Sequence, residues 1–316
     1  MRAMVLKFYG GPEAFVLENL PTPIAGDDEL LIKIHASSVN PSDVKIRRGD
    51  IKIFSGKSYP KISILGYDIA GEVVEVGKNV QGFRTGDAVY ALSQGKQGGG
   101  YAEYVALPAK QVAHKPHNLD FLQAASVPLG ALTAWQALKF SHRTLAGHDI
   151  LINGACGGVG IYAVQLAKHL GANITAVAHP EHQQLMRDFG ADRVLDYSVD
   201  DFMHYAGSYD LIFDVAAKRS YAECKSKLKP NGRYLTTVPN NFTMLHIVMT
   251  HLRPGKKAAF LIAAAEGSRL AEISQLIEKN ILRPIVDQVF PLEQIGAAQT
   301  YYETGNTQGR NVIQII

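Results

Sequence analysis

The sequence has few of the residues that mark a secreted, metal-rich or membrane-spanning protein. Its 316 residues include only two cysteines, Cys156 and Cys224. Two cysteines cannot supply a four-cysteine metal site and are typical of a reducing compartment. No apolar run approaches the length of a membrane span, and the first residues, MRAMVLKFYGG, are too short in apolar character for a signal peptide. We therefore expect a cytoplasmic protein.

The chain also lacks a large excess of positive or negative charge. The chain has 32 Lys and Arg against 29 Asp and Glu, a net charge of +3, and its longest basic cluster is Lys45–Arg48. A charge this small and this dispersed favours neither a nucleic-acid partner nor an anionic membrane, so we expect neither. The length of 316 residues and the hydrophobic content of 47% predict a globular protein of two domains.

Two kinds of patterning divide the chain. Up to about residue 119, short strand-like runs such as ELLIKIHA (29–36) alternate between apolar and polar residues and are broken by Gly, Pro and Asp. This pattern predicts a mostly β domain, with polar loops at 39–50 and 66–68. From about residue 121, helical spacing and short apolar runs alternate up to about residue 265. That alternation predicts a parallel sheet with helices on both faces.

The stretch from Asp149 to Gly171 combines a buried strand (150–152), a glycine-rich turn and an apolar helix. The turn fits A-x-G-x-x-G, with Ala155 in place of the first glycine, followed by Gly157 and Gly160. In this strand–turn–helix order the pattern predicts a dinucleotide phosphate site at a helix N-terminus. A purely structural glycine turn is the alternative.

The strand that follows favours NADPH as the dinucleotide, with NADH still possible. An NAD enzyme places Asp or Glu at the end of its second strand, about twenty residues after the glycine turn. Here that strand ends at Ala178-His179, and the next acid, Glu181, lies beyond the tip.

Several motifs in sequence support a family assignment. They are VNPSDVKIRRG (39–49), GYDIAGEVVEVGKNVQGFRTGDAVY (66–90), GGYAEYVAL (99–107), LTAWQAL (132–138), NGACGGVG (153–160), FGADRVLDY (189–197) and GRNVIQI (309–315). The chain resembles the quinone oxidoreductase, or zeta-crystallin-like, branch of the medium-chain dehydrogenase/reductase superfamily over essentially its whole length. The resemblance implies an α/β protein in which a GroES-like β-rich catalytic domain (1–122 and 266–316) carries an inserted Rossmann doubly wound parallel-sheet domain (123–265).

The resemblance also implies that the catalytic zinc of other superfamily members is absent. The positions of their three ligands fall on Asn40, Tyr67 and Leu129 in this sequence. A catalytic zinc needs three protein ligands and an open fourth position, and none of these three residues is a customary ligand. The close cysteines of the structural zinc lobe are missing too. We therefore expect no metal.

Without a Lewis acid, the resemblance implies hydride transfer to acceptors that are already electrophilic: quinones, or α,β-unsaturated ketones and aldehydes. Negative charge then develops on the acceptor oxygen, which hydrogen-bond donors must stabilise. One alternative is an NADPH-binding protein with little catalytic role, crystallin-like or regulatory. A second is an enzyme acting on a thioester-linked acyl substrate, which would need a more basic cleft than this sequence offers.

The catalytic candidates implied by the resemblance are Asn40, Lys45 and Tyr67. Asn40 is the first candidate donor to the substrate oxygen, but an Asn before Pro41 also suits a structural turn. Lys45 is the second candidate, with a solvated loop cation as the alternative. Tyr67 either lines the substrate pocket or packs against the strands. Asp43 is interpreted as an orienting or structural carboxylate.

The cofactor-binding candidates combine the glycine turn with positions implied by the resemblance. A basic residue and Tyr197 hold the 2′-phosphate in NADPH-specific relatives, and the basic position falls on His182, with His179 beside it. Histidine predicts an NADPH preference that falls from mildly acid to mildly alkaline pH; exposed, non-functional histidines are the alternative. The full set is Thr133, Gly154, Ala155, Gly157, Gly158, Val159, Gly160, His179, His182, Tyr197 and Val238. Relatives are commonly homodimers, and segment 257–265 is the expected edge strand.

Overall fold

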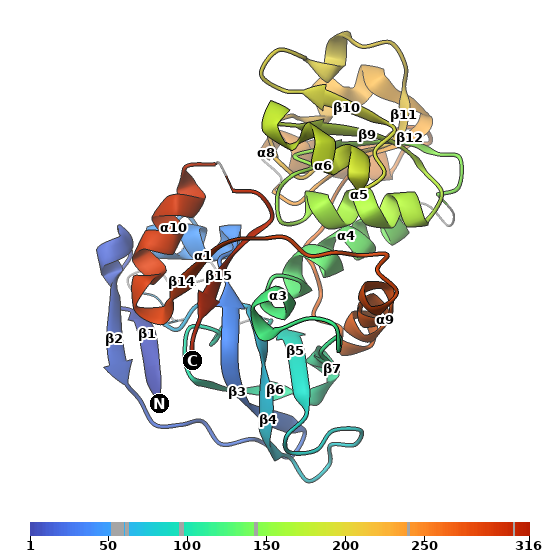
Figure 1. The fold of residues 1–316 in the computed structure, drawn as a ribbon. Helices are drawn as coiled ribbons and strands as arrows, with labels where there is room; N and C mark the ends of the chain where they lie inside the picture. The colour runs from blue at the N-terminus through green and yellow to red at the C-terminus, as the bar shows by residue number, and fades with distance from the viewer. Residues whose placement is uncertain (52–59, 61–62, 95–97, 142–144, 239–240, 306) are drawn as a thin grey trace. The chain divides into compact units, whose positions relative to one another are not determined.

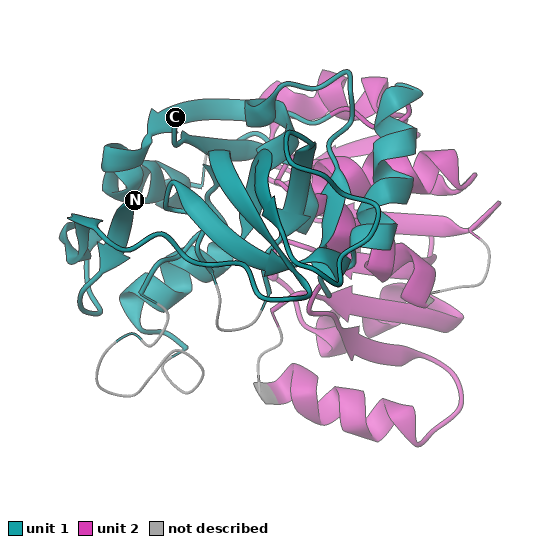
Figure 2. Cartoon of the chain, turned by 90° about the horizontal axis from the view of Figure 1, so that it is seen from below, with its two compact units in different colours: residues 1–129, 264–280, 284–316 teal, residues 130–263, 281–283 magenta. Residues whose placement is uncertain are grey.

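The structure is a computed structural model that describes residues 1–51, 60, 63–94, 98–141, 145–238, 241–305 and 307–316. It divides into two compact units (Figure 2). Unit 1 comprises Met1–Leu129, Ala264–Asn280 and Pro284–Ile316, and unit 2 comprises Gly130–Ala263 and Ile281–Arg283. Unit 2 is inserted between two parts of unit 1, with boundaries after residues 129 and 263 where the sequence suggested 122 and 265.

Unit 2 contains the predicted parallel sheet. Its six strands lie in the order β10-β9-β8-β11-β12-β13, and every neighbouring pair is parallel. The chain therefore starts in the centre at β8, builds outward to β10, and then returns across to β11. This reversal between β8 and β11 is the switch point at which doubly wound sheets bind dinucleotides. The strands are β8 (Asp149–Asn153), β9 (Asn173–Ala178), β10 (Arg193–Asp196), β11 (Tyr209–Asp214), β12 (Leu228–Thr236) and β13 (Lys257–Phe260).

The helices of unit 2 alternate with these strands, as the periodicity predicts. Two helices occupy residues 121–141, because Pro128 begins a new helix at the position where a missing N–H costs nothing. Helix α7 is short and is followed by a 3-10 turn, since β12 already begins at Leu228. The helices are α4 (Pro128–Ser141), α5 (Gly160–His169), α6 (Gln183–Asp188), α7 (Tyr221–Cys224) and α8 (Asn241–His251), with 3-10 turns at Pro180–His182, Phe202–His204 and Lys225–Lys227.

Unit 1 is built on a mostly antiparallel sheet of seven strands. Six lie in the order β14-β15-β3-β4-β5-β7, and β6 pairs with β3; only β14 and β15 run parallel. The C-terminal strands thus complete a sheet begun by the first third of the chain (Figure 1). The strands are β3 (Glu29–Ser38), β4 (Asp68–Val76), β5 (Ala88–Leu92), β6 (Tyr104–Pro108), β7 (Val112–His114), β14 (Val286–Pro291) and β15 (Arg310–Gln314), beside the two-stranded pair β1 (Arg2–Leu6) and β2 (Phe15–Asn19).

The interpretation of residues 39–50 as a loop is wrong. Pro41–Arg48 forms helix α1, with Asn40 at its N-cap and Gly49 in the left-handed conformation at its C-cap. Asn, Pro and Asp favour turns, but in this order they also start a helix, because the N–H of Asn40 is bound by the Asp43 carboxylate three residues on. The other helices of unit 1 are α3 (Phe121–Ala125), α9 (Gly267–Glu278) and α10 (Ile295–Glu303), with 3-10 turns at Pro12–Ala14, Ala109–Gln111 and Leu292–Gln294.

Arg47 joins distant parts of unit 1. Its side chain on α1 is only 2% exposed, and it donates to Gln299 Oε1 (2.7 Å), the Gly10 carbonyl (2.9 Å) and Glu303 Oε2 (2.7 Å). All three partners lie in the N-terminal or C-terminal segments of the chain. Because a buried guanidinium is stable only with its charge and donors matched, these bonds hold α10 against α1.

Each unit has its own apolar core. In unit 1 the core includes Leu30, Ile32, Ile69, Val89 and Ile313, all with 0% exposure. In unit 2 one cluster includes Leu151, Ile212, Tyr221, Leu228 and Tyr234. No helix in the described part of the chain is long and apolar enough to cross a membrane.

Candidate functional site

The glycine loop between β8 and α5 has the geometry of an anion cradle. Gly154 adopts φ = +86°, a conformation that a side chain would strain. Among the described residues, the backbone N–H groups of Gly158 and Val159 have no acceptor, and they precede the first turn of α5. Unpaired donors at a helix N-terminus attract phosphate oxygens. Burial raises the pKa of the Cys156 thiol to about 11, which keeps this loop side chain uncharged.

The two later glycines of the motif serve different purposes. A Cβ at Gly160 would lie 2.2 Å from the Gly154 carbonyl oxygen, so glycine is required there for the loop to close. A Cβ at Gly157 would meet only that same oxygen, at an ordinary 3.6 Å. Space therefore remains in front of Gly157, where a pyrophosphate can approach the backbone. The residues of this loop fit a dinucleotide.

Helix α4 lies directly against this loop. A Cβ at Gly130 would be 2.0 Å from the Gly158 carbonyl oxygen, so only glycine permits the approach. Thr133, three residues later, lies on the same face of α4 and is 5% exposed. Val238 follows β12 and is 42% exposed, with its N–H donating to Thr236 Oγ1 (3.3 Å). These positions extend the site from the loop toward the carboxyl ends of the strands.

The three residues predicted to hold a 2′-phosphate come together in the structure. The His179 ring centroid lies 6.0 Å from that of His182 and 5.8 Å from that of Tyr197. They occupy the carboxyl ends of β9 and β10, next to the strand that carries the glycine loop. His179 Nδ1 accepts the Glu181 N–H at 3.4 Å, and the Glu181 carboxylate lies 3.7 Å from the same nitrogen. Because Glu181 would repel a phosphate, a ligand there requires its exposed side chain to turn away.

In unit 1, the three segments that carry zinc ligands in related proteins converge on Asp68. Its Oδ2 accepts from Ser38 Oγ (2.5 Å) and Asn40 Nδ2 (2.8 Å), and its Oδ1 accepts from the Leu129 N–H (2.7 Å). Asp68 itself is 0% exposed. The guanidinium of Arg310 (3% exposed) donates to Asn40 Oδ1, which adds a positive charge to the group. We name Ser38, Asn40, Asp68, the Leu129 N–H and Arg310 the Asp68 network.

The donor set of this network does not fit zinc. Asn40 and Tyr67 are poor ligands for zinc, and Leu129 contributes only a backbone N–H. The Asp68 carboxylate is already surrounded by three donors, which take the place that a cation would need. Among the described residues, no group of three His, Cys, Asp or Glu side chains is arranged to hold a metal ion.

The three catalytic candidates lie in different environments. Asn40 is 0% exposed, with both ends of its amide bound inside the Asp68 network. The half-buried Tyr67 packs against the core of unit 1; burial, and then the charge of Asp43, raise its pKa well above the usual value. The Lys45 side chain on α1 is half-buried, and it forms no ion pair among the described residues. The amide of Asn40 is therefore already used inside the Asp68 network, whereas the hydroxyl of Tyr67 and the ammonium of Lys45 lie outside that network.

Asp43 links α1 to the segment that leads into Tyr67. Its carboxylate accepts the N–H of Asn40 (2.8 Å) and the N–H of Gly66 (3.0 Å) at 0% exposure. Burial raises its pKa to about 7, against the opposing effect of these two N–H donors. The buried Asp43 carboxylate is thus placed to orient the backbone, and it is not accessible to act as a base.

The sequence did not lead us to predict several residues of the site. Asp214, at the end of β11, is 0% exposed and accepts from Asn153 Nδ2 (2.8 Å), the Arg219 N–H (2.9 Å) and the Tyr234 hydroxyl (3.0 Å). It fixes the two strands at the switch point of the sheet. An acid ending a predicted strand is its only sequence signal; Ser38 and Arg310 have none.

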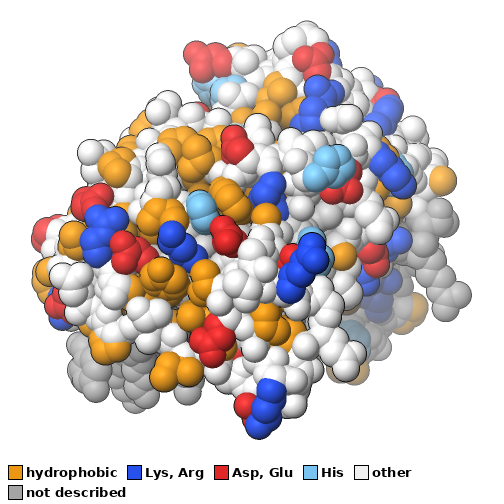
Figure 3. All heavy atoms as spheres, turned by 60° about the horizontal axis from the view of Figure 1, so that its bottom comes forward, with side chains coloured by type: hydrophobic (Ala, Val, Ile, Leu, Met, Phe, Trp, Pro, Cys, Tyr) orange, Lys and Arg blue, Asp and Glu red, His pale blue; other side chains and the backbone are white. Residues whose placement is uncertain are grey.

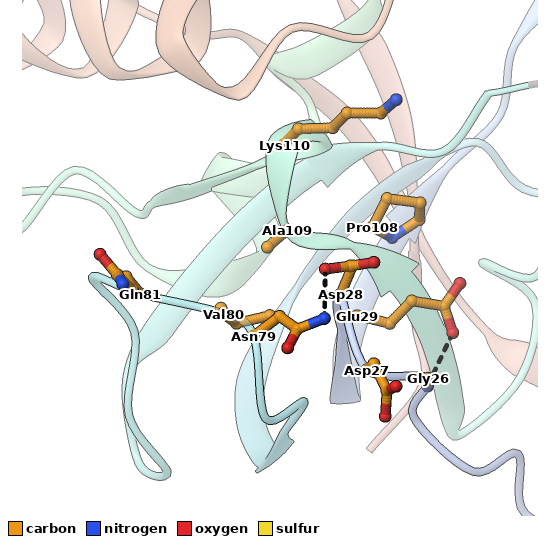
Figure 4. A pocket seen from close by; sticks show the side chains of 10 residues that line it. All are labelled: Gly26, Asp27, Asp28, Glu29, Asn79, Val80, Gln81, Pro108, Ala109 and Lys110. Atoms are coloured by element: carbon orange, nitrogen blue, oxygen red, sulfur yellow. Dashed lines mark hydrogen bonds between the residues drawn. The ribbon is translucent and has the colours of Figure 1, made fainter.

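A hollow of about 820 Å³ lies elsewhere in unit 1, lined by residues 26–29, 79–81 and 108–110 (Figure 4). Two of its polar pairs are bound to each other: Asn79 Nδ2 donates to Asp28 (3.1 Å) and the Gly26 N–H donates to Glu29 (3.0 Å). It contains none of the predicted site residues. On the face of the molecule in Figure 3, Lys and Arg side chains are interspersed with Asp and Glu side chains, without a large area of one sign.

Known proteins resemble the chain over its full length. Residues 26–117 match the alcohol dehydrogenase GroES-like domain, and residues 189–313 match the zinc-binding dehydrogenase model. The chain is 33% identical over 324 residues to an NADPH-dependent alkenal/one oxidoreductase of Arabidopsis thaliana, covering 99% of this chain and 79% of that protein. It is 32% identical over 326 residues to a quinone oxidoreductase of Triphysaria versicolor, covering 99% and 98%.

A solved structure with a similar fold is the quinone oxidoreductase from Coxiella burnetii. It matches with a TM-score of 0.91 and 30% sequence identity, covering 100% of this chain and 99% of that one. The predicted fold class, a GroES-like β-rich domain with an inserted Rossmann domain, is confirmed by the sheets described above and by these matches.

Proposed function

Because the chain belongs to the medium-chain dehydrogenase/reductase superfamily, we propose that it is an NADPH-dependent oxidoreductase. Its acceptors are quinones or α,β-unsaturated ketones and aldehydes. The names of its relatives, an alkenal/one oxidoreductase and a quinone oxidoreductase, support these two substrate classes. The observation that carries the proposal is the open glycine loop with its unpaired N–H groups, next to the His179–His182–Tyr197 cluster.

In this proposal the residues of unit 2 bind and orient the dinucleotide. The Gly158 and Val159 N–H groups hold the pyrophosphate, and His179, His182 and Tyr197 hold the 2′-phosphate. Thr133 and Val238 lie toward the nicotinamide. NADPH supplies the hydride when it is bound.

The residues of unit 1 stabilise the charge that develops on the acceptor oxygen. The half-buried Tyr67 hydroxyl is the first candidate donor, because packing against the core of unit 1 positions it and a tyrosine hydroxyl is protonated through the neutral range. The Lys45 ammonium is the second. Asn40 stays a predicted donor, but its amide must first leave Asp68 or Arg310 to reach a substrate. We assign it the role of holding the site together.

The proposed chemistry is independent of zinc. The donors around Asp68 occupy the place of a metal, so no residue of this site is arranged to polarise a simple ketone. Acceptors that are already electrophilic at carbon need only hydrogen bonds to oxygen, which Tyr67 and Lys45 supply.

Steady-state kinetics with NADPH and NADH against a panel of quinones, alkenals and enones test the proposal. We expect turnover with NADPH, and a decrease of about 10²-fold in kcat for Tyr67→Phe. Tyr104→Phe, on β6 of the same unit, serves as the matched control. With deuterated NADPH, enantioselective transfer to carbon distinguishes enone reduction from the single-electron reduction of quinones, which yields semiquinone. Absence of turnover across the panel contradicts the proposal.

A second candidate is an NADPH-binding protein with little catalytic role. The complete internal pairing of Asn40 favours it, because the strongest expected donor is not available to a substrate. Calorimetry that finds tight NADPH binding, combined with no turnover on the panel, selects this candidate.

We further propose a cytoplasmic homodimer. Strand β13 is at the end of its sheet and pairs only with β12 among the described strands. On its outer side the Ala258 N–H already donates to Thr250 Oγ1 of helix α8, so a second β13 would pair through the next outward N–H, that of Phe260. Phe260→Pro removes that donor. Sedimentation velocity of this variant against the unsubstituted chain tests the dimer.

A further inference from the structure

Helix α8 presents its apolar residues outward. The side that packs against the body of unit 2 carries Thr243 (2% exposed), the half-buried Ile247 and the half-buried Thr250. A surface helix of a globular protein usually does the opposite, with its apolar stripe on the core and its polar residues in water. Because threonines face inward, α8 does not have the usual pattern of a surface helix, in which apolar residues face the core and polar residues face water.

The outward face is large and continuous. Five apolar side chains of α8 share it together with Leu252, which lies in the turn after the helix, and on a wheel of 100° per residue the five span an arc of roughly 160°. Their exposed fractions are Phe242 74%, Met244 40%, Leu245 56%, Val248 61%, Met249 42% and Leu252 81%. Single exposed apolar residues are normal, but a contiguous set of this kind marks an interaction surface. We name these six residues the α8 stripe.

The helix that carries the stripe is held firmly. It packs against β13, at the outer edge of the sheet. The Ala258 N–H donates to Thr250 Oγ1 (3.1 Å), and the Lys257 ammonium donates to the carbonyl of Thr250 (2.7 Å) and to that of Arg253. These bonds satisfy the C-terminal end of α8 and fix its orientation, so the stripe is a preformed surface.

Basic residues surround the end of this helix. Residues 224–265 contain seven Lys and Arg and no Asp or Glu, whereas the remaining residues contain 25 Lys and Arg against 29 Asp and Glu. Lys256 Nζ donates to the Lys225 carbonyl (2.8 Å), which brings Lys225, Lys256 and Lys257 together with Arg253 near the end of the stripe. The net charge of +3 therefore averages a basic segment and an acidic remainder.

We propose that α8 docks the chain on the surface of an anionic lipid bilayer. An apolar helix face flanked by Lys and Arg fits such a surface, because the apolar residues enter the boundary of the acyl chains while the basic residues face lipid phosphates. A second copy of the chain fits the stripe less well. It would bring Lys225, Arg253, Lys256 and Lys257 of one copy close to the same four basic residues of the other.

The docking is interfacial. Helix α8 has 11 residues and is about 16 Å long, too short to span a bilayer. This departs from the expectation of no membrane partner, which the overall net charge suggested. The inference does not depend on the proposed oxidoreductase activity, and vesicle binding is measured without cofactor or substrate.

Co-sedimentation of the full chain with vesicles tests the proposal. We expect binding to vesicles of phosphatidylcholine and phosphatidylglycerol, weaker binding to phosphatidylcholine alone, and release at high salt. Leu245→Glu with Leu252→Glu should lower the partition coefficient at least about tenfold, because two leucines no longer enter the lipid. Ile24→Glu with Phe8→Glu in unit 1 is the matched control, since these apolar side chains are 82% and 48% exposed and the pair adds the same two negative charges.

Reversing the charge of basic residues near the end of the α8 stripe tests their contribution to vesicle binding. Arg253→Glu with Lys225→Glu should lower binding to the anionic vesicles by about fivefold or more for each side chain. Lys110→Glu, on an exposed lysine of unit 1, should have little effect. Circular dichroism confirms that each variant is folded; all the substituted side chains are exposed.

Three results overturn the proposal. The first is no binding to anionic vesicles at low salt. The second is equal loss of binding in the α8 variants and in their unit 1 controls. The third is dissociation of an oligomer by the Leu245→Glu, Leu252→Glu variant in the absence of vesicles, which assigns the stripe to a second copy of the chain.

Discussion

The Asp68 network in unit 1 and the glycine loop in unit 2 show two opposite ways of building a site. In the network, a buried carboxylate is surrounded by donors from Ser38, Asn40 and Leu129, and no capacity is left for a ligand. In the loop, the N–H groups of Gly158 and Val159 are left without acceptors and the space before Gly157 is open. The hydrogen-bonding groups of the Asp68 network bind one another. The free N–H groups of the glycine loop find an acceptor only when an anion binds.

The difference shows what lies at the positions that resemble the zinc-ligand segments of this superfamily. A buried carboxylate without partners is costly. In this chain the Asp68 carboxylate is paired inside a hydrogen-bond network that also contains an arginine. The glycine loop instead keeps backbone donors accessible.

Removing Asp68 should have the largest effect on stability. Asp68→Ala leaves the Ser38, Asn40 and Leu129 donors unpaired and the charge of Arg310 uncompensated, at a cost of about 3–5 kcal/mol. Urea unfolding measures the loss. Asp27→Ala, in an exposed ion pair with Lys78, is the control and should stay within about 0.5 kcal/mol. A loss below about 1 kcal/mol for Asp68→Ala means that the network is not closed as described.

Asp43 makes the stability of unit 1 depend on pH. Its pKa is raised from 3.8 to about 7, so between these values the folded chain holds a proton that the unfolded chain releases. Its contribution to stability is therefore full below about pH 4, falls as the pH rises toward about 7, and is constant above. The fall is at most about 4 kcal/mol.

Urea unfolding across this pH range measures the effect of Asp43. Asp43→Asn should flatten the decline relative to the unsubstituted chain, whatever its effect at a single pH. Equal slopes for the two proteins contradict the assignment.

Alanine substitutions at two nearby positions of the glycine loop should have different effects, one on folding stability and the other on NADPH binding. Gly160→Ala places a Cβ 2.2 Å from the Gly154 oxygen and should cost about 1–3 kcal/mol of stability. Gly157→Ala meets only a 3.6 Å contact, so it should leave the melting temperature unchanged and raise the Kd for NADPH about tenfold. Calorimetry and thermal melts measure the two quantities. A Gly157→Ala variant with unchanged Kd shows that the open space is not the pyrophosphate site.

Replacing a histidine of the cluster should have the smallest effect. His182→Lys supplies a charge that persists at alkaline pH, and it should tighten NADPH binding by up to about fivefold, since exposed charge pairs contribute at most about 1 kcal/mol. NADH binding should not change. His204→Lys, exposed and outside the cluster, is the control. Equal effects on both dinucleotides exclude contact between His182 and the 2′-phosphate.

The sequence predicted the sheet of unit 2 and its glycine loop because both depend on local patterns. Alternating strands and helices allow few arrangements, and glycine is required at Gly154 by its positive φ and at Gly160 by the close Gly154 oxygen. It did not predict helix α1. Asn40, Pro41 and Asp43 start turns as readily as helices, and the choice depends on burial of the Asp43 carboxylate against the Gly66 N–H, 23 residues away.

Helix α8 was not predicted for a different reason. Its apolar residues do not form a stripe that faces the core, and the residues that do face it, Thr243 and Thr250, are weak helix formers. The helix exists because β13 and Lys257 bind its inner side and its C-terminal end.

The sequence by itself determined the order of the elements and the glycine loop, because each is a property of residues close together in the chain. Only the tertiary structure decided that Asp68 gathers donors from Ser38, Asn40 and Leu129, that His179, His182 and Tyr197 meet, and that the apolar side of α8 faces outward. Each of these depends on contacts between residues far apart in sequence, or on which side of a helix the sheet covers. No local pattern encodes either.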